Sequence, residues 1–141
     1  MIGIVITGHG QFATGLSSAV EMIAGKSINV AAVDFGLECS TDELSRQLKQ
    51  AVNSFENCDK VLFLTDLLGG SPFRCSVLAG SEIAESKVIA GTNLAMALEV
   101  VLSRECDNLE QLMEMAITAG KNGVQSYAYV GKCKKHTSTG I

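Results

Sequence analysis

Short apolar runs rich in β-branched residues alternate along this chain with longer stretches that repeat apolar residues at helical spacing. The runs are the first residues of the chain, up to a Gly-His-Gly turn at 8–10, and then Asn29–Phe35, Lys60–Thr65 and Lys87–Ala90. Nearly continuous apolar runs of this kind are typical of parallel strands that are covered on both faces. The alternation therefore predicts an α/β fold: a doubly wound, mostly parallel open sheet with helices on both faces.

The stretches between these runs predict the helices that cover the sheet. Ser40 and Glu43 form a capping box before the second helix. Ser71 is the predicted N-cap of the third helix, with Pro72 at its first helical position. The residues expected to face inward are Phe12, Leu16, Ala19, Val20 and Ile23; Leu44, Leu48, Ala51, Val52 and Phe55; Leu94, Leu98, Val101 and Leu102; and Leu109, Leu112, Met113, Ala116 and Ile117.

The length of 141 residues suits a single domain with a sizeable core. We expect that domain to span 1–130 and the remaining residues, 131–141, to form a polar tail. Gln125–Val130 alternates enough to predict a last strand, but a strand this short is unstable without a neighbour. We therefore expect it to pair with the sheet edge of a second copy, in a homodimer.

Charge and composition exclude several classes of function. A formal net charge of -4, without a clustered basic surface, argues against a nucleic-acid partner. No apolar run approaches the roughly 20 residues that cross a bilayer, and the first residues lack the features of a signal peptide, so we expect a cytoplasmic protein. The five cysteines are scattered and odd in number, as free thiols of a reducing compartment are. With only His9 and His136 as further soft ligands, we predict no metal and no cofactor.

His9 stands between Gly8 and Gly10, directly after the first predicted strand. Ligand crevices of open α/β sheets lie outside the carboxyl ends of the strands, and flanking glycines let another molecule approach an imidazole closely. His9 is therefore the candidate catalytic residue. The alternative is a loop histidine whose ring is satisfied by the backbone, and the Gly-His-Gly turn alone does not separate the two.

Asp66 follows the third predicted strand, and a glycine-rich loop leads from it to Ser71. If strands one and three meet at the switch point of the sheet, His9, Asp66 and Ser71 share one crevice. A carboxylate that accepts a hydrogen bond from one imidazole nitrogen leaves the other nitrogen as a nucleophile. The product that best suits this turn is a phosphohistidine, with Ser71 and the backbone of Gly69 and Gly70 holding phosphoryl oxygens. Without that chemistry, Asp66 only caps its loop and Ser71 only caps its helix.

Two other kinds of site fit part of this pattern. Gly8-x-Gly10 after strand one, with Asp34 at the end of strand two, is similar to a dinucleotide-binding fingerprint, but Ala13 occupies the place of the third glycine. A Ser-His-Asp hydrolase fits less well, because Ser71 follows Gly-Gly instead of standing in a Gly-x-Ser-x-Gly elbow. Each explains fewer of these residues than phosphoryl transfer does.

Three segments of the chain resemble a known family. They are Val5-Ile6-Thr7-Gly8-His9-Gly10, Leu64-Thr65-Asp66-Leu67-Leu68-Gly69-Gly70-Ser71-Pro72-Phe73 and Val88-Ile89-Ala90-Gly91-Thr92-Asn93-Leu94. They are similar to the signature segments of the IIA components of the mannose/fructose/sorbose family of the bacterial sugar phosphotransferase system. The motifs Thr-Gly-His-Gly and Pro-Phe-Arg and the terminal Gly-Ile look most like members for N-acetylgalactosamine or galactosamine.

This resemblance implies a doubly wound sheet, a homodimer that exchanges a C-terminal strand, and a phosphoryl relay. The phosphorylated histidine of the family corresponds to His9, its orienting aspartate to Asp66 and its phosphoryl-binding serine to Ser71. Phospho-HPr would be the donor, and a IIB component that feeds a membrane IIC/IID permease would be the acceptor. Two alternatives stay open: the phosphotransfer subunit of a dihydroxyacetone kinase, and a small-molecule or regulatory binding domain whose histidine is not phosphorylated.

Overall fold

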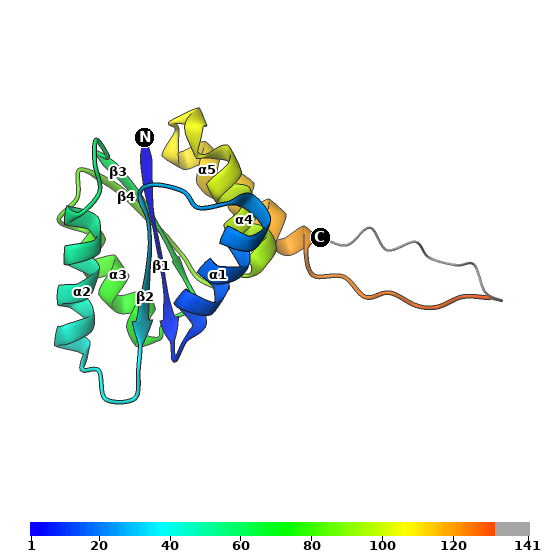
Figure 1. Cartoon of the computed structure of the whole chain (residues 1–141), viewed down its shortest axis with the longest axis horizontal. Helices are drawn as coiled ribbons and strands as arrows, with labels where there is room; N and C mark the ends of the chain where they lie inside the picture. The colour runs from blue at the N-terminus through cyan, green and yellow to red at the C-terminus, as the bar shows by residue number, and fades with distance from the viewer. Residues whose placement is uncertain (132–141) are drawn as a thin grey trace.

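The computed structural model of the chain describes residues 1–131, which form four strands, five α-helices and a short 3-10 helix (Figure 1). In chain order the elements are β1 (Ile2–His9), α1 (Phe12–Ala24), β2 (Val30–Phe35), α2 (Thr41–Asn53), β3 (Lys60–Thr65), α3 (Ser71–Gly80), β4 (Glu85–Ile89), α4 (Leu94–Ser103), η1 (Arg104–Cys106) and α5 (Leu109–Asn122). Nearly all of the predicted polar tail, including Cys133 and His136, lies outside the described residues.

The four strands form one parallel sheet in the order β2-β1-β3-β4. The chain moves from β1 outward to β2 and then returns past β1 to β3, so the switch point lies between β1 and β3. Thr7 of β1 is paired with Thr65 of β3. This register brings the residues that follow, His9 and Asp66, to the same carboxyl edge of the sheet. The predicted doubly wound α/β fold is confirmed.

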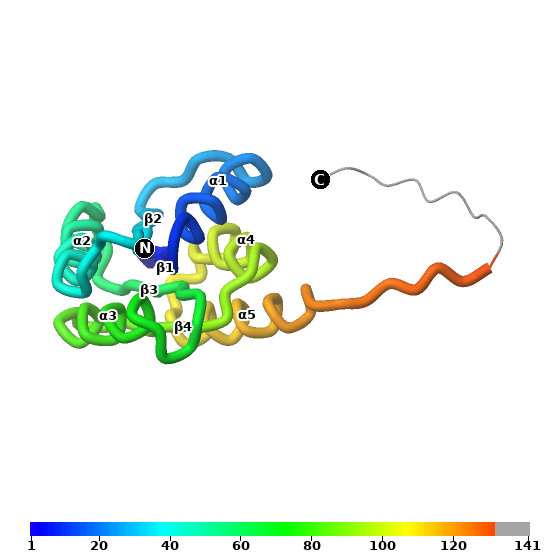
Figure 2. Tube along the Cα trace, turned by 90° about the horizontal axis from the view of Figure 1, so that it is seen from below, coloured from blue at the N-terminus to red at the C-terminus, as the bar shows by residue number. Residues whose placement is uncertain are grey.

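Alternate residues of the central strands face two layers of helices on opposite sides of the sheet (Figures 1 and 2). Ile4 of β1 and Leu62 of β3 pack with residues of α1, α4 and α5. Val5 and Phe63, the next residues along the same strands, pack with residues of α2 and α3. Burial on both faces explains why these strand sequences are almost continuously apolar.

The capping serine predicted for α3 is displaced by one residue. Gly70, with φ -71 and ψ 169, is the N-cap, so Ser71 is the first helical residue and Pro72 the second. Gly69 turns the chain with a φ of +80, and the Gly70 carbonyl then accepts the first helical bond, from the N–H of Arg74 at 2.9 Å. Pro72 still lies in the first turn, where its missing N–H breaks no helical bond. In α2, by contrast, Ser40 caps the helix as predicted, accepting from the N–H of Glu43 at 3.1 Å.

The inward orientation predicted for Leu102 is wrong, because its side chain is 67% exposed, and Ile23, near the end of α1, is also exposed, at 41%. The buried face of α4 carries Ala97, Val100 and Val101 and continues to Arg104, just beyond the helix. These positions follow helical spacing, and the helix face that they define does not include Leu102. Leu102 therefore points to solvent near the end of the helix.

The last described residues, 124–131, form no strand in the single chain. They leave α5 and run away from the body of the molecule in both views (Figures 1 and 2). The predicted strand at Gln125–Val130 is therefore absent when only one copy is present. Its expected partner is the sheet edge of a second copy, so the exchange of this segment stays a prediction.

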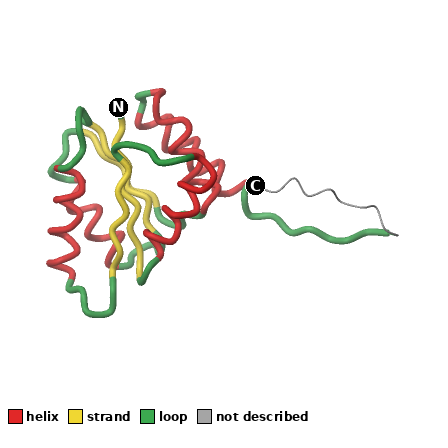
Figure 3. Tube along the Cα trace, in the orientation of Figure 1, coloured by secondary structure: helices red, strands yellow, loops and turns green. Residues whose placement is uncertain are grey.

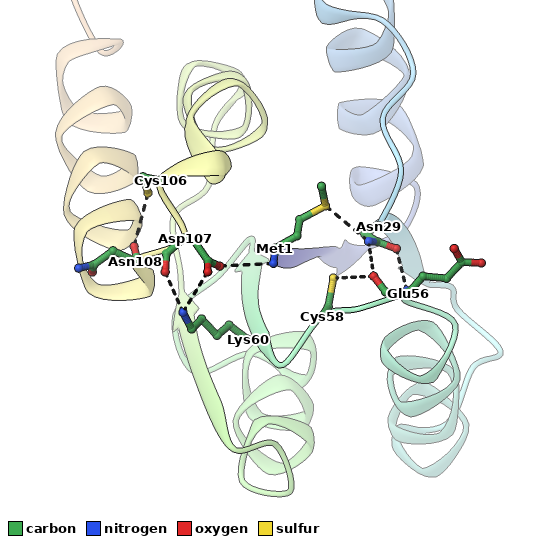
Figure 4. Close-up of polar contacts among 8 residues, drawn as sticks. All are labelled: Met1, Asn29, Glu56, Cys58, Lys60, Cys106, Asp107 and Asn108. Carbon is green, nitrogen blue, oxygen red and sulfur yellow. Dashed lines mark hydrogen bonds and ion pairs between the residues drawn. The ribbon is translucent and has the colours of Figure 1, made fainter.

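A polar network fastens the amino end of the sheet, opposite to the end that carries His9 (Figure 4). Asn29 has a φ of +56; its side chain accepts from the N–H of Glu56 at 3.0 Å and donates to the Glu56 carbonyl at 2.9 Å. Its own carbonyl accepts from the N–H of Ile4 at 2.9 Å. Nearby, Lys60 donates to the carbonyl of Asp107 at 2.7 Å. These bonds join the loops at the amino end of the sheet, whereas His9 lies at the carboxyl end.

Candidate functional site

His9 is the last residue of β1, and its side chain is 48% exposed although the rest of the strand is buried. Gly10 follows with a φ of +60, a conformation that suits glycine, and turns the chain toward α1. The connections that follow the strands lie around this turn, at the lower edge of the sheet in Figure 3. Strand β1 thus presents one imidazole to solvent at the switch point.

Asp66 binds His9 at two atoms. Its Oδ2 accepts a hydrogen bond from Nδ1 of the ring and another from the backbone N–H of His9, each at 2.8 Å, and its Oδ1 accepts from the N–H of Leu67 at 2.7 Å. Burial by itself raises the pKa of this carboxyl, but the hydrogen bonds from His9 and Leu67 outweigh it, so the pKa of Asp66 lies below its usual value. Asp66 is therefore a carboxylate at neutral pH.

The ionised state of Asp66 fixes the tautomer of a neutral His9 ring. A carboxylate only accepts hydrogen bonds, so the hydrogen shared by the two side chains belongs to Nδ1. Nε2 then carries the free lone pair. The arrangement presents Nε2 as a nucleophile and places a negative charge where the ring becomes positive once Nε2 forms a bond.

Gly70 lets the loop after β3 lie directly against the His9 ring. A Cβ at this position would be 2.9 Å from Cε1 of His9 and 3.2 Å from the Leu67 carbonyl oxygen, so a larger residue would displace the ring. Gly8 has a different role from the predicted one. A Cβ at Gly8 would collide with the ring of Phe12, so this glycine makes room for α1 and not for an approaching molecule.

Phe35 is a neighbour of His9 that the sequence analysis missed. The two rings meet edge to face, with their centroids 5.7 Å apart and an interplanar angle of 70°. Phe35 ends β2 and is paired with His9 in the sheet, and its carbonyl accepts from the N–H of Gly10 at 2.8 Å. The signal that could have found it is that both residues end their predicted strands, because adjacent parallel strands end at the same edge.

Ser71 follows Gly70 at the start of α3, so the three predicted site residues come to one end of the sheet. Every other α-helix in residues 1–131 has a side chain that accepts from an N–H of its first turn: Asp34 for α1, Ser40 for α2, Asn93 for α4 and Asn108 for α5. Helix α3 has no such acceptor. Since Pro72 has no N–H, the N–H groups of Ser71 and Phe73 are the donors that this helix start offers to an anion.

Asp34 is engaged with α1 and does not face a ligand. Its Oδ1 accepts from the N–H of Thr14 at 3.0 Å, and its Oδ2 accepts from the Thr14 hydroxyl at 2.7 Å. Both oxygens thus cap the helix, whereas the dinucleotide alternative requires them for a ribose.

An apolar groove of about 730 Å³ has among its lining residues both Asp66 and Val124, the second residue after α5. Leu67 and Leu68 line it near the site, and residues of α3, β4, α4 and α5, including Ile117, line much of the remainder. The two leucines are 64% and 74% exposed. The groove therefore joins the site to the edge strand β4.

The described part of the chain offers no metal centre: no three His, Cys, Asp or Glu side chains gather there in a way that could hold an ion. The cysteines in it, Cys39, Cys58, Cys75 and Cys106, are free thiols. Within residues 1–131, no helix is both long enough and apolar enough to cross a membrane.

Comparison with known proteins places this chain in a family. The model of EIIA-man, described as "PTS system fructose IIA component", matches residues 3–117. The chain belongs to this family. Among EIIA relatives, the "PTS system fructose-specific EIIA component" of Bacillus subtilis (strain 168) is 34% identical over 113 residues, which make up 80% of this chain and 77% of that protein.

Another EIIA relative is considerably longer than the part it shares with this chain. The "PTS system mannose-specific EIIAB component" of Escherichia coli (strain K12) is 32% identical over 126 residues, which are 89% of this chain but only 39% of that protein. Among solved structures, the phosphotransferase system component EIIA from Streptococcus agalactiae is 36% identical, with a TM-score of 0.82. The match covers 89% of this chain and 97% of that one, so the EIIA fold accounts for most of the chain.

Proposed function

We propose that this EIIA-family chain is a phosphoryl carrier of a sugar phosphotransferase system, which accepts a phosphoryl group on His9 from phospho-HPr and passes it to a IIB component. The observation that carries the proposal is the pair of 2.8 Å bonds between His9 and Asp66, which leave Nε2 of a half-exposed ring as the nucleophile. The family match over residues 3–117 supports it.

In the proposed step the lone pair of His9 Nε2 forms a bond to phosphorus while the bond between phosphorus and the donor breaks. The ring becomes positively charged, and the Asp66 carboxylate stabilises that charge through the hydrogen on Nδ1. The second transfer is the same exchange in reverse: a nucleophile of the IIB component binds phosphorus, and the bond to Nε2 breaks. Nδ1 keeps its hydrogen throughout, so Asp66 orients and stabilises the ring without being phosphorylated.

We assign the phosphoryl oxygens to the start of α3, where Ser71 supplies a hydroxyl and the backbone supplies the N–H groups of Ser71 and Phe73. Support comes from the free helix start, because α3 differs from the other described α-helices in having no side-chain acceptor in its first turn. An anion is favoured at such an end by the helix dipole and by donors without helical partners.

Incubation with labelled phosphoenolpyruvate, enzyme I and HPr tests this function. We expect acid-labile label on the wild-type chain and on His136→Gln, and none on His9→Gln. His136 is the matched control, since it is the second of the two histidines in the sequence. Label retained by His9→Gln contradicts the assignment. An unlabelled wild-type chain favours the binding-domain alternative, and label that passes to a dihydroxyacetone kinase instead of a IIB component favours the kinase subunit.

We also propose a homodimer in which residues 125–130 of one copy pair with the β4 edge of the other. Strand β4 is at the edge of the sheet, and the groove beside it is apolar. The segment that leaves α5 carries exposed apolar residues, among them Val124 and Val130. Pairing would satisfy the open backbone edge of β4 and cover the groove.

The sugar and the location are proposed from the resemblance. We propose that the relay serves N-acetylgalactosamine or galactosamine uptake through a IIC/IID permease and that the chain acts in the cytoplasm. Deletion of the gene that encodes this chain should abolish uptake of these amino sugars. Expression of the wild-type chain should restore uptake, whereas expression of His9→Gln should not. Unchanged uptake after deletion contradicts this choice of sugar.

A further inference from the structure

The hydrogen bond to Asp66 holds the His9 ring at a single ring atom. It holds Nδ1 at 2.8 Å from Oδ2, but the ring can still turn about its Cβ–Cγ bond into orientations in which Nδ1 no longer faces Asp66. The side chain is 48% exposed, and its neighbours along the chain, Gly8 and Gly10, have no side chains to confine it. A contact away from Nδ1 therefore strengthens the preference for the bonded orientation, which sets the plane of the ring and the direction of the Nε2 lone pair.

Two contacts of this kind are present. The backbone of Gly70 stands against the Cε1 edge of the ring, where an added Cβ would be 2.9 Å from Cε1 and 3.7 Å from Nε2. The ring of Phe35 meets the imidazole in a T-shaped contact, with centroids 5.7 Å apart. Gly70 limits the ring on one edge only. Phe35 is the one side chain in ring contact with His9 among the described residues, and it comes from a different strand.

We propose that Phe35 is a positioning residue that fixes the plane of the His9 ring and so aims Nε2 at the incoming phosphorus. T-shaped aromatic pairs change the population of a conformation by about 2- to 10-fold, enough to shift the balance between the ring orientation that keeps the bond to Asp66 and those that lose it. A ring turned away from Asp66 is free to carry its hydrogen on Nε2. The kinetic consequence of this inference rests on the proposed function. The structural consequence, which concerns the unphosphorylated ring, does not.

The role of the Phe35 ring is separable from that of its backbone. The backbone pairs with His9 in the sheet and accepts from the N–H of Gly10 at 2.8 Å. Both features survive a change of side chain. Phe35→Leu therefore removes the aromatic contact but keeps the strand pairing and an apolar residue, and Phe35→Tyr keeps a ring.

Phe55 provides a matched control for these variants. Like Phe35, it is a partly buried phenylalanine packed against the core cluster on the α2 and α3 side of the sheet. It lies near Gly3, close to the start of β1, where a Cβ on Gly3 would strike its ring. Phe55→Leu thus makes the same chemical change in the same core, at the end of the strand away from His9.

The first readout is the tautomer ratio of the neutral His9 ring, measured from its ¹⁵N chemical shifts without any phosphoryl donor. In Phe35→Leu we expect the ratio of Nδ1–H to Nε2–H to fall by about 2- to 10-fold, whereas Phe35→Tyr and Phe55→Leu should retain the wild-type ratio. The second readout is phosphoryl transfer from phospho-HPr. We expect its rate to fall by about tenfold in Phe35→Leu, because the reacting nitrogen is misaimed, and to be unchanged in Phe55→Leu.

An unchanged tautomer ratio in a folded Phe35→Leu variant overturns the inference, and so does an equal change in Phe55→Leu. If Phe35→Leu does not fold, the wild-type chain decides: nuclear Overhauser contacts between the Phe35 ring and the His9 ring protons support the inference, and their absence overturns it. A wild-type chain that accepts no phosphoryl group contradicts the proposed function. The tautomer measurement still tests the positioning role of Phe35 in that case, because it needs no phosphoryl donor.

Discussion

Asp66 combines two tasks at the scale of a single residue, because each of its oxygens has a separate partner. One oxygen holds the backbone and the ring of His9, and the other holds the N–H of Leu67 at the start of its own loop. The loop and the histidine are thereby fixed to the same carboxylate. A change at Asp66 should consequently affect the chemistry of His9 more than the fold, since the strands on either side stay paired.

Asp66→Asn tests the orienting role of the carboxylate. An amide oxygen is a weaker acceptor and carries no charge to stabilise a positive ring, so phosphoryl transfer from phospho-HPr should slow by roughly 100-fold or more, by analogy with other orienting aspartates. Transfer assays with labelled donor, quenched at a series of times, measure the rate, and circular dichroism checks the fold. Asp34→Asn is the control, because Asp34 only caps α1, and it should change the rate little. Equal rates for wild type and Asp66→Asn are incompatible with the role.

The depressed pKa of Asp66 also predicts how stability depends on pH. A carboxyl whose pKa is lower in the folded than in the unfolded chain contributes stability above its unfolded pKa and loses it as the pH falls through the folded one. The wild-type chain should therefore lose more stability than Asp66→Asn when the pH is lowered from neutral to below about 4. Urea unfolding at a series of pH values measures both curves, and parallel curves speak against the assignment.

At the scale of elements, the amino and carboxyl ends of the sheet divide stability from chemistry. Asn29 joins the loop before β2 to the loop after α2 through two side-chain bonds with the backbone of Glu56. Its positive φ, which asparagine tolerates better than most residues, adds to the preference for this residue. Neither contact reaches the histidine, so the loss of this link should weaken the fold and spare the site.

Asn29→Ala should reduce the free energy of unfolding by about 2–4 kcal/mol, because it removes two hydrogen bonds and strains a left-handed residue. Asn57→Ala is the control: Asn57 has the same φ of +56 but no hydrogen bond to another described residue, so it should lose only the conformational part, about 1–2 kcal/mol. Denaturant unfolding of the two variants and the wild type measures both losses. Phosphoryl transfer per folded molecule should match the wild type in both variants, and a loss of transfer in Asn29→Ala would show that the two ends are coupled.

The sequence predicted the elements well because burial on two faces leaves a clear apolar signal in the strands, and glycine and capping residues mark where helices start and end. It also placed His9 and Asp66 at one edge, since the switch point follows from strand order. It missed Phe35 because a side-chain contact between strands requires the register of β1 and β2. The inward orientation predicted for Leu102 was wrong because the helical pattern alone did not show which side of α4 packs against the sheet.

At the scale of the whole molecule, the exposed leucines beside Asp66 are the expected contact for partners. In the proposed relay, phospho-HPr and the IIB component each approach the same Nε2, so their docking surfaces should overlap, and weak binding suits a relay. Leu68→Asp should weaken both complexes, seen as lost chemical-shift perturbation in titrations. Leu102→Asp is the control, a similarly exposed leucine near the end of α4 away from the site. Loss of one partner only would mean that the chain presents two separate faces.

The dimer is a second prediction at this scale. Truncation after Gly123 removes the segment proposed to pair with β4 of a second copy, so light scattering at micromolar concentration should show a dimer for the full chain and a monomer for the truncated one. Truncation after Gly131 is the control, since it keeps residues 125–130, and it should remain dimeric. A monomeric full chain under these conditions rules out the exchange.

The residues in contact with His9 are distant in the sequence: Asp66 is 57 positions away, Phe35 ends β2 and Gly70 lies in the loop after β3. Before β2 and β3 have paired with β1, the imidazole is no different from that of a short peptide. Newly made or heat-damaged copies would therefore neither draw phosphoryl groups from the donor nor waste them to water. The phosphoryl flux through the proposed relay would then depend on native molecules only, and the phosphorylation state of His9 would report on the folding of the chain.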